Sequence, residues 1–209
     1  MSRWVSFWRK SSLDRCNSLA ALYCRAKGLL LYRWVFQSFG SGSTIAKPML
    51  ISNPQFISIG AHVSIRPGVR LEAVRSAPHR VPELRIGSGA NIEQNVHIVC
   101  HCRIHIGENV SITGQCAIVD VTHPYEDIAN PVKIGARILD EDSFVEIGDG
   151  AFLGIGTVVL PNVRIGRGSV TAARSVVTSD IPDYSVAAGA PAKVIRTYDP
   201  TTESWLRVR

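Results

Sequence analysis

The chain has 209 residues, 45% of them apolar and 19% charged, which is enough for one folded domain and excludes an intrinsically disordered chain. The net charge of +6 is carried entirely by residues 1–37, which hold seven basic side chains and one acidic side chain. The remaining residues hold 16 basic and 16 acidic side chains. Because this larger part is neutral and offers no broad basic surface, the composition argues against a nucleic-acid-binding protein.

The cysteine usage indicates a reducing compartment, and the hydropathy predicts no transmembrane helix, so a cytoplasmic location is expected. The five cysteines are an odd number and show no repeated pairs at zinc-finger spacing. No run reaches the roughly 18 uncharged apolar residues that a transmembrane helix needs. The closest run, at 18–36, is interrupted by Arg25, Lys27 and Arg33. A signal peptide is not expected, because the first aromatic residues alternate with charges.

Residues 1–44 are predicted to form a basic, amphipathic helical segment that ends in the linker GSGST at 40–44. Two roles remain open for it. It could cap the first strands of the following domain, or it could bind the inner face of a membrane through residues 1–37. Apolar residues recur in it at three- and four-residue spacing, with basic residues mostly between them. The apolar set is Trp4, Phe7, Trp8, Leu19, Leu22, Tyr23, Ala26, Leu29, Leu30 and Trp34.

From residue 45 onward the apolar pattern has a period of six residues. In the clearest block, at 147–182, the first position is apolar in five of six units and the fifth is small or β-branched. A period of six predicts triangular coils of three units, stacked as parallel strands about 4.8 Å apart. The predicted fold class is therefore all-β, a parallel β-helix at 45–198 with a C-terminal tail at 199–209. The repeat occurs in blocks that begin at Ile59, Ile86, Ile106 and Ile147.

The stretch HIVCHCRIH at 97–105 has the residue types of a zinc site, because thiolate and imidazole both bind this metal. The six-residue phase, however, places Cys102 in an inward slot, with Cys116 in the same slot one coil later. A strand also cannot fold its alternate residues around one ion. No metal site is predicted here.

Three segments of the chain resemble a known family. The repeat units resemble the hexapeptide-repeat acyltransferases, whose fold is a left-handed parallel β-helix. The ending SVVTSDIPDYSVAAGAPAKVIR, at 175–196, is similar to the terminal segment of the galactoside and maltose O-acetyltransferases. The stretch DVTHPYED, at 120–127, resembles polysaccharide O-acetyltransferases, although Val121 replaces a histidine that those proteins often have. The resemblance covers about residues 50–198.

This resemblance implies an O-acetyltransferase that moves an acetyl group from acetyl-coenzyme A to a hydroxyl of a sugar or glycan precursor. It also implies a homotrimer. A narrow β-helix leaves no internal cavity for a substrate, so the reaction is expected where neighbouring subunits meet. Two alternatives stay open: a zinc enzyme related to the β-helix carbonic anhydrases, and a structural β-helix protein without catalytic activity.

The repeat stops at His123 and returns at Ile147, which predicts a loop at 124–146 beside a general base. A sugar hydroxyl is a poor nucleophile until its proton is removed, and imidazole is suited to that task near neutral pH. In the family this histidine is the base, whereas an arbitrary loop histidine has no such role. The second ring nitrogen needs an orienting partner, usually a carboxylate or a carbonyl. The candidate partners are Asp120, which could equally cap a turn, and the loop residues Glu126 and Asp127.

Contacts with the acceptor are expected from residues near this base and about thirty residues before it. Some relatives carry a substrate-contacting asparagine upstream, where this chain has Glu93, with Asn95 close by. Tyr125, two residues after the histidine, is a further candidate. The departure at Glu93 indicates a different acceptor.

The resemblance also assigns a site for coenzyme A in the segments FLGIGTVV and PAKVIR. Ile155 lacks the hydroxyl that helps to hold the oxyanion in some relatives, so a backbone N–H near Gly154 is expected instead. Ser179 replaces a lysine, which removes one phosphate contact, whereas Lys193 and Arg196 match residues that approach the 3′-phosphate and pyrophosphate. The full set of candidates is Phe152, Gly154, Ile155, Ala173, Thr178, Lys193 and Arg196.

Overall fold

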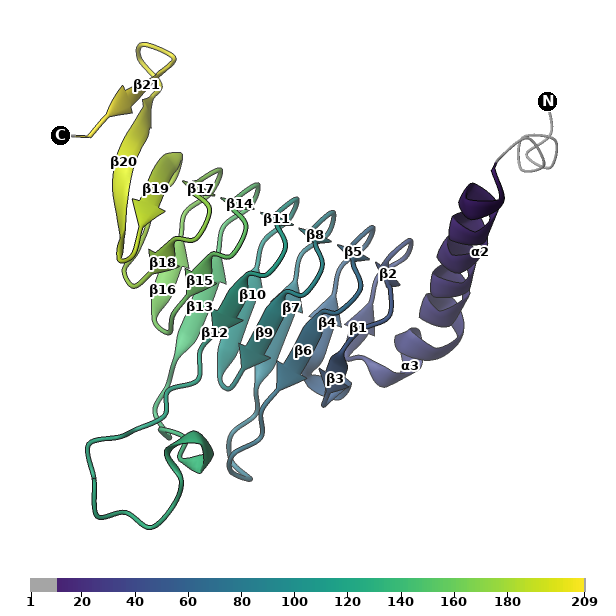
Figure 1. The fold of residues 1–209 in the computed structure, drawn as a ribbon, viewed down its shortest axis with the longest axis horizontal. Coiled ribbons are helices and arrows are strands. Elements are labelled where there is room, and N and C mark those ends of the chain that lie inside the picture. Colours follow the sequence, from purple (N-terminus) through teal and green to yellow (C-terminus); the bar gives the residue numbers. More distant parts are fainter. Residues whose placement is uncertain (1–10, 209) are drawn as a thin grey trace.

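The structure, a computed structural model that describes residues 11–208, is a long prism of three parallel β-sheets (Figure 1). Each turn of the chain adds one short strand to each sheet in succession. Neighbouring strands within a sheet therefore come from successive turns. This arrangement fits the left-handed parallel β-helix expected from the repeat. The predicted aromatic residues Trp4, Phe7 and Trp8 lie outside the described residues.

The three sheets are named A, B and C in the order in which the chain visits them. Sheet A contains, in spatial order, β1 (Ser38–Phe39), β4 (Ile57–Ile59), β7 (Glu83–Ile86), β10 (Arg103–Ile106), β13 (Phe144–Ile147) and β16 (Val163–Ile165). Sheet B contains β2 (Thr44–Ile45), β5 (Ser64–Ile65), β8 (Asn91–Ile92), β11 (Ser111–Ile112), β14 (Phe152–Leu153), β17 (Val170–Thr171), β19 (Ser185–Gly189), β20 (Ala192–Asp199) and β21 (Ser204–Arg207). Sheet C contains β3 (Leu50–Ser52), β6 (Arg70–Ala73), β9 (His97–Cys100), β12 (Ala117–Val119), β15 (Val158–Val159) and β18 (Val176–Val177).

The first position of each repeat unit builds a continuous apolar core. In sheet A, Ile86, Ile106 and Ile147 pair in register across three successive coils, and none is more than 3% exposed. Their columns run along the inside of the prism. Burying one such aliphatic side chain contributes about 1.5–3 kcal/mol. The repeat therefore specifies the fold through burial at every sixth residue.

The fifth position accepts a hydroxyl where a backbone carbonyl lies close enough to bond it. Thr157 Oγ1 donates to the Gly154 carbonyl at 2.7 Å, and Ser169 Oγ donates to the Pro182 carbonyl at 2.6 Å. Both serine and threonine are fully buried. An unpaired buried hydroxyl would cost about 1–3 kcal/mol, so these bonds are what makes a polar residue acceptable there.

The prediction of an inward slot is wrong for Cys102 and correct for Cys116. Strand β9 continues through Cys100, which is fully buried, and the chain turns only after it. Cys102 is consequently half-buried in the turn before β10, whereas Cys116 is 1% exposed. The phase was misjudged because the unit that begins at Ile98 has eight residues instead of six, so that Ile104, and not Cys102, is the inward residue before Ile106.

Aromatic side chains close the N-terminal end of the prism. Helix α2 (Ser12–Lys27) is followed by the π-helix η1 (Gly28–Tyr32) and the short α3 (Arg33–Val35). Tyr32 and Phe36 are almost fully buried, and their rings meet each other and Phe39 at centroid distances of 5.3–5.5 Å. Residues 28–36, which pack against Phe39 of β1, thus cover the open edge of the first coil, as a cap must.

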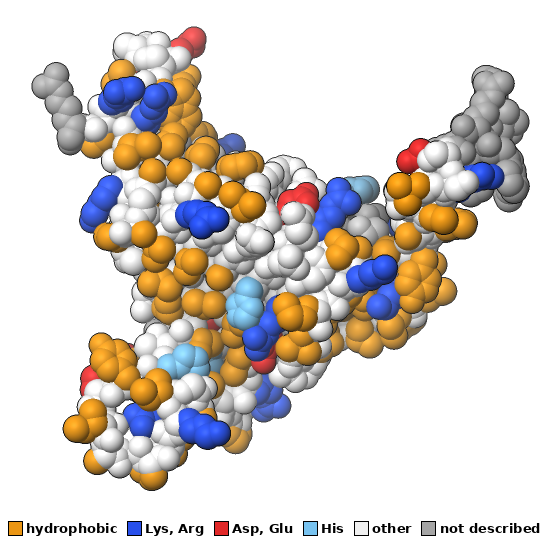
Figure 2. Space-filling model, viewed as in Figure 1, with side chains coloured by type: hydrophobic (Ala, Val, Ile, Leu, Met, Phe, Trp, Pro, Cys, Tyr) orange, Lys and Arg blue, Asp and Glu red, His pale blue; other side chains and the backbone are white. Residues whose placement is uncertain are grey.

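Helix α2 itself does not bury a residue. It begins at the cap Ser11, whose hydroxyl accepts the Asp14 N–H, and its leucines and tyrosine are exposed. Figure 1 shows α2 leaning away from the prism, and Figure 2 shows orange and blue side chains interleaved over this end. No helix of the described part of the chain is both long and apolar enough to cross a membrane.

The boundaries predicted at 44 and 199 differ from the structure. The β-helix begins earlier, at β1, and residues 40–44 form its first corner instead of a linker: the Gly40 N–H donates to the Ile59 carbonyl at 2.8 Å. The C-terminal tail is also structured. Strand β20 runs to Asp199, and β21 pairs antiparallel with it, which extends sheet B.

Two excursions interrupt the coils, both between a strand of sheet C and the next strand of sheet A (Figure 1). The predicted loop at 124–146 is present but ends sooner, because β13 begins at Phe144. It contains one short 3-10 helix, η3 (Ile134–Ala136). The second excursion, at 74–82, was not predicted. A further 3-10 turn, η2 (Pro54–Phe56), occupies the same corner one coil earlier.

The aromatic cap predicts a sharp contrast between two neighbouring substitutions. Phe36→Ala should lower the free energy of unfolding by about 3–5 kcal/mol, because it empties a buried aromatic site. Trp34→Ala removes a side chain that is 75% exposed and should change it by no more than about 0.5 kcal/mol. Urea unfolding followed by circular dichroism measures both. Equal effects would show that the cap does not belong to the cooperative core.

Candidate active site

The predicted site residues divide between two corners of the prism. The corner between sheets C and A, called the C–A corner, carries His123 in the excursion after β12. The corner between sheets B and C, called the B–C corner, carries the predicted acceptor residues and the turn after β14. Sheet C separates the two corners. Within one chain, therefore, the histidine and most of its predicted partners do not meet.

The ring of His123 is oriented by a backbone carbonyl. Its Nδ1 lies 2.7 Å from the carbonyl oxygen of Arg137, and the side chain is otherwise exposed. A carbonyl can only accept a hydrogen bond, so Nδ1 carries the proton in this contact. In the neutral ring, Nε2 then carries no proton and keeps its lone pair. This is the state that a general base needs.

None of the three carboxylates proposed as partners contacts the histidine. Glu126 accepts the Tyr125 N–H at 2.9 Å, and Asp127 accepts the Ala129 N–H at 3.1 Å. Both carboxylates are therefore engaged in local turns. The sequence analysis named no particular carbonyl as the partner. Arg137 is fourteen positions from His123 in an irregular loop, and no sequence pattern identifies its carbonyl.

Asp120 is a turn-capping residue at the base of the excursion. It is 1% exposed, and its carboxylate accepts the backbone N–H groups of His101, Cys102 and Arg103. Burial raises the pKa of the Asp120 carboxyl, while these three donors oppose the rise. Its own carbonyl accepts the Ser143 hydroxyl at 2.7 Å, which ties the two ends of the excursion together.

The unpredicted excursion at 74–82 supports the same corner. Arg80 donates to Asp140 at 3.0 Å and to Asp142 at 2.6 Å, and His79 lies 3.1 Å from Asp140. These ion pairs hold the pKa of Asp140 below its usual range, chiefly through the hydrogen bond from Arg80. The signal for this excursion was available in the sequence, since the six-residue phase is lost between Arg70 and Ile86.

The turn after β14, at residues 154–157, offers one free backbone donor. The N–H of Gly154 is not free, because it donates to the Thr171 carbonyl at 2.9 Å in the stacked coil below. A side chain could not replace its hydrogen, since an added Cβ would lie 2.6 Å from the Ala173 nitrogen. The N–H of Ile155 has no partner among residues 11–208, and its side chain is exposed. The candidate donor is thus one residue later than the glycine.

A β-bulge brings the two predicted phosphate ligands onto one face. Lys193 and Arg196 would point to opposite faces of a regular strand. The register shifts between Val186 and Ala187, so Lys193 pairs with Ala188 and Arg196 pairs with Val186. Both cations therefore lie on the outer face of sheet B.

This outer face also includes residues from four other strands of sheet B. Val186 is in register with Val170, and Val170 with Phe152, so the phenyl ring shares the face of Arg196. Arg207 of β21 pairs with Arg196 and adds a cation that sequence reasoning missed, because it lies beyond the recognised segment. Within the described part of the chain, none of Lys193, Arg196 and Arg207 has a carboxylate at ion-pair distance. We call these three residues the basic face.

The remaining candidates are spread over both corners. Glu93 forms an ion pair with Arg66 at 3.7 Å on the B–C corner, and Asn95 adopts a left-handed backbone there, with φ of 58°. Tyr125 is exposed on the excursion, and Thr178 is exposed at the C–A corner. Among residues 11–208, no three His, Cys, Asp or Glu side chains are placed to hold a metal ion.

Comparison with known proteins agrees with this geometry. Residues 144–179 match the family model described as bacterial transferase hexapeptide (six repeats). A lipopolysaccharide biosynthesis O-acetyl transferase of Escherichia coli (strain K12), WbbJ, is 31% identical over 163 residues, which cover 76% of this chain and 80% of that protein. The galactoside O-acetyltransferase of Lactococcus lactis is 37% identical over 113 residues, 54% of this chain and 52% of the relative. For Rv3034c of Mycobacterium tuberculosis, named as an acetyltransferase and 38% identical, the chain spans 37% of the relative's length.

Solved structures show the same fold at lower sequence identity. A mutant of AntD, an N-acyltransferase from Bacillus cereus, in complex with dTDP and coenzyme A matches with a TM-score of 0.67 at 22% identity, over 82% of this chain and 89% of AntD. The fold is a parallel β-helix whose candidate site residues lie at two corners and on the outer face of sheet B. The chain belongs to the hexapeptide-repeat transferases, and it is an enzyme of the acyltransferase class.

Proposed function

We propose that the protein transfers an acetyl group from acetyl-coenzyme A to a hydroxyl of a sugar or glycan precursor, with His123 as the general base. The observation that carries this proposal is the hydrogen bond from His123 Nδ1 to a carbonyl, which leaves Nε2 free at an exposed corner. The relatives named as O-acetyltransferases of galactosides and of lipopolysaccharide support the acceptor class.

The reaction needs one proton transfer in each direction. Nε2 of His123 takes the proton of the acceptor hydroxyl as its oxygen attacks the thioester carbonyl carbon. The Ile155 N–H, which has no partner among residues 11–208, donates to the oxygen that becomes negative. When the carbon–sulfur bond breaks, the imidazolium returns its proton to the leaving thiolate. The products are the acetyl ester and free coenzyme A.

A homotrimer completes this site, because the base and the Ile155 donor lie at different corners of one chain. If the B–C corner of one subunit faces the C–A corner of its neighbour, both groups line a single cleft. Light scattering at micromolar concentration tests this arrangement. A fully active monomer would contradict it.

The base is tested by removing one imidazole at a time. His123→Ala should lower the turnover number by roughly 10²–10⁴-fold, because the hydroxyl loses its proton acceptor. The matched control is His79→Ala, which removes an exposed histidine at the same corner and should keep normal turnover. Thiol release from acetyl-coenzyme A is measured against a panel of glycans that includes an amino sugar. Normal turnover in the His123 variant would place the base elsewhere.

The basic face is tested with two forms of the donor. Lys193→Ala combined with Arg196→Ala should weaken the binding of coenzyme A more than the binding of dephospho-coenzyme A. The reason is that each charge-assisted phosphate contact contributes about 1.5–3 kcal/mol. Arg207→Ala should act in the same direction. Arg167→Ala removes an exposed cation from another corner and serves as the control. Equal losses for both ligands, measured by titration calorimetry, would show that these side chains do not reach the 3′-phosphate.

We also propose that the N-terminal end binds the inner face of an anionic membrane from the cytoplasm. The cap is formed by residues 28–36 and leaves apolar side chains of α2, η1 and α3 exposed: Leu22 by 62%, Leu30 by 78% and Trp34 by 75%. All five cysteines are free, as expected in a reducing compartment. Exposed aromatic and aliphatic residues beside unpaired cations are typical of helices that lie in a membrane interface.

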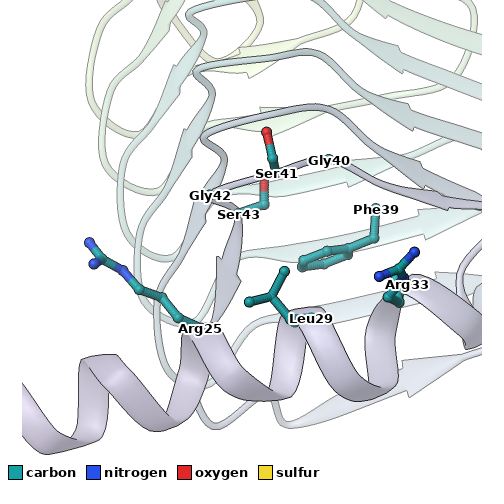
Figure 3. A pocket seen from close by; sticks show the side chains of 9 residues that line it. Arg25, Leu29, Arg33, Phe39, Gly40, Ser41, Gly42 and Ser43 are labelled. Carbon is teal, nitrogen blue, oxygen red and sulfur yellow. The ribbon is translucent and has the colours of Figure 1, made fainter.

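A hollow of about 460 Å³ between α2 and the first coil adds to this surface (Figure 3). Leu29 and Phe39 form its apolar side, and Arg25 and Arg33 flank it at either end. Neither arginine has a carboxylate partner in the described part of the chain. Near an anionic bilayer each basic residue contributes up to about 1 kcal/mol.

Membrane binding is tested without disturbing the cap. Full-length protein should co-sediment with anionic vesicles at low salt and less at moderate salt, because surface charges are screened. Combined substitution Leu22→Gln, Leu30→Gln and Trp34→Gln should abolish binding and keep transfer to a soluble acceptor. Neutral vesicles are the control. If the unaltered protein stays in the supernatant at both salt levels, this surface serves another purpose, such as contact with a second copy of the chain.

A further inference from the structure

The loop that carries the candidate base has no apolar core of its own. No residue at 121–143 is buried, and the aliphatic side chain of Ile128 is 96% exposed. Hydrophobic packing therefore cannot decide where the loop lies. Its stem is closed by the Leu139 N–H, which donates to the Thr122 carbonyl at 3.0 Å, but this contact does not reach the loop tip.

A single guanidinium organises the rest of the loop. Arg137 donates from Nε to the Val132 carbonyl at 2.7 Å, from Nη1 to the Asp127 carbonyl at 2.9 Å and from Nη2 to the Asn130 carbonyl at 2.8 Å. The three acceptors lie within one six-residue stretch of the loop, at 127–132. Arg137 has no carboxylate partner in the described chain, so its planar fork of donors is committed to backbone oxygens.

The backbone of the same arginine contacts the histidine. The Arg137 carbonyl accepts from His123 Nδ1 at 2.7 Å, and the Arg137 N–H donates to the Ile134 carbonyl at 3.0 Å. Side chain and main chain of one residue thus connect the loop tip to the imidazole. A shift of the loop would displace this carbonyl and release the ring.

We propose that Arg137 is the positioning residue of the site. Its guanidinium holds the loop, and the Arg137 carbonyl thereby keeps His123 in the tautomer whose Nε2 is unprotonated. Lysine cannot replace it, because a single ammonium cannot reach three carbonyls in one plane. The catalytic consequence rests on the proposed function, whereas the effect on the imidazole does not.

The tautomer is measured directly by nitrogen NMR of histidine-labelled protein at alkaline pH, where imidazole is neutral, with His123→Gln used to assign the signals. Wild-type protein should show the proton on Nδ1 of His123. Arg137→Ala and Arg137→Lys should both shift His123 toward a mixture of tautomers. Lys133→Ala removes an exposed cation from the same loop and should leave the wild-type signals unchanged. A proton on Nε2 in the wild type, or unchanged populations in Arg137→Ala, would overturn the proposal.

Turnover supplies the second readout. Arg137→Ala should lower kcat roughly 10–100-fold, as expected for a misplaced reacting group, with the KM for acetyl-coenzyme A nearly unchanged. The melting temperature should stay close to that of wild type, because no buried side chain is involved. Normal kcat in Arg137→Ala would remove the positioning role. Normal turnover in His123→Ala would instead remove the proposed base, while the NMR result would still decide whether Arg137 holds the ring.

Discussion

The stacking of one coil directly on the next is the constraint on which the rest of the molecule depends. Parallel strands about 4.8 Å apart leave room only for close-fitting inward side chains and for corners without bulk. Gly154 illustrates the limit, because a Cβ there would collide with the backbone of the coil below. A prism packed in this way has no interior to hold a substrate. Chemistry is therefore confined to its outer faces and corners.

The two excursions use the freedom that only a corner provides. A residue inserted within a strand would break the ladder on both sides, whereas extra residues between sheets C and A leave every strand pairing intact. Both excursions leave from this corner, and ion pairs from Arg80 to Asp140 and Asp142 bind one to the other. Asp120 secures their common base by capping the turn at 101–103. Imidazole and loop consequently rest on a rigid support.

Each end of the prism solves the problem of an open sheet edge in its own way. At the N-terminal end, the rings of Tyr32, Phe36 and Phe39 cover the first coil. At the C-terminal end, an antiparallel hairpin continues sheet B beyond the last coil. The N-terminal end leaves apolar residues of α2 exposed, and the C-terminal end presents the basic face, whose cations have no carboxylate partner in the described chain. The surfaces proposed to bind the membrane and coenzyme A therefore lie at the two ends of the prism, where these edges are closed.

The sequence alone determined the repeating core and the place of its main interruption, because both are written as a period of six that either holds or stops. Tertiary structure decided what depends on stacked neighbours. The contact from His123 to the Arg137 carbonyl arises from the path of an irregular loop, which has no periodic signal. Lys193 and Arg196 share a face only because a bulge shifts the pairing of β19 with β20. Asp120 is a cap because three N–H groups of the preceding coil converge on it, and such convergence exists only in the folded chain.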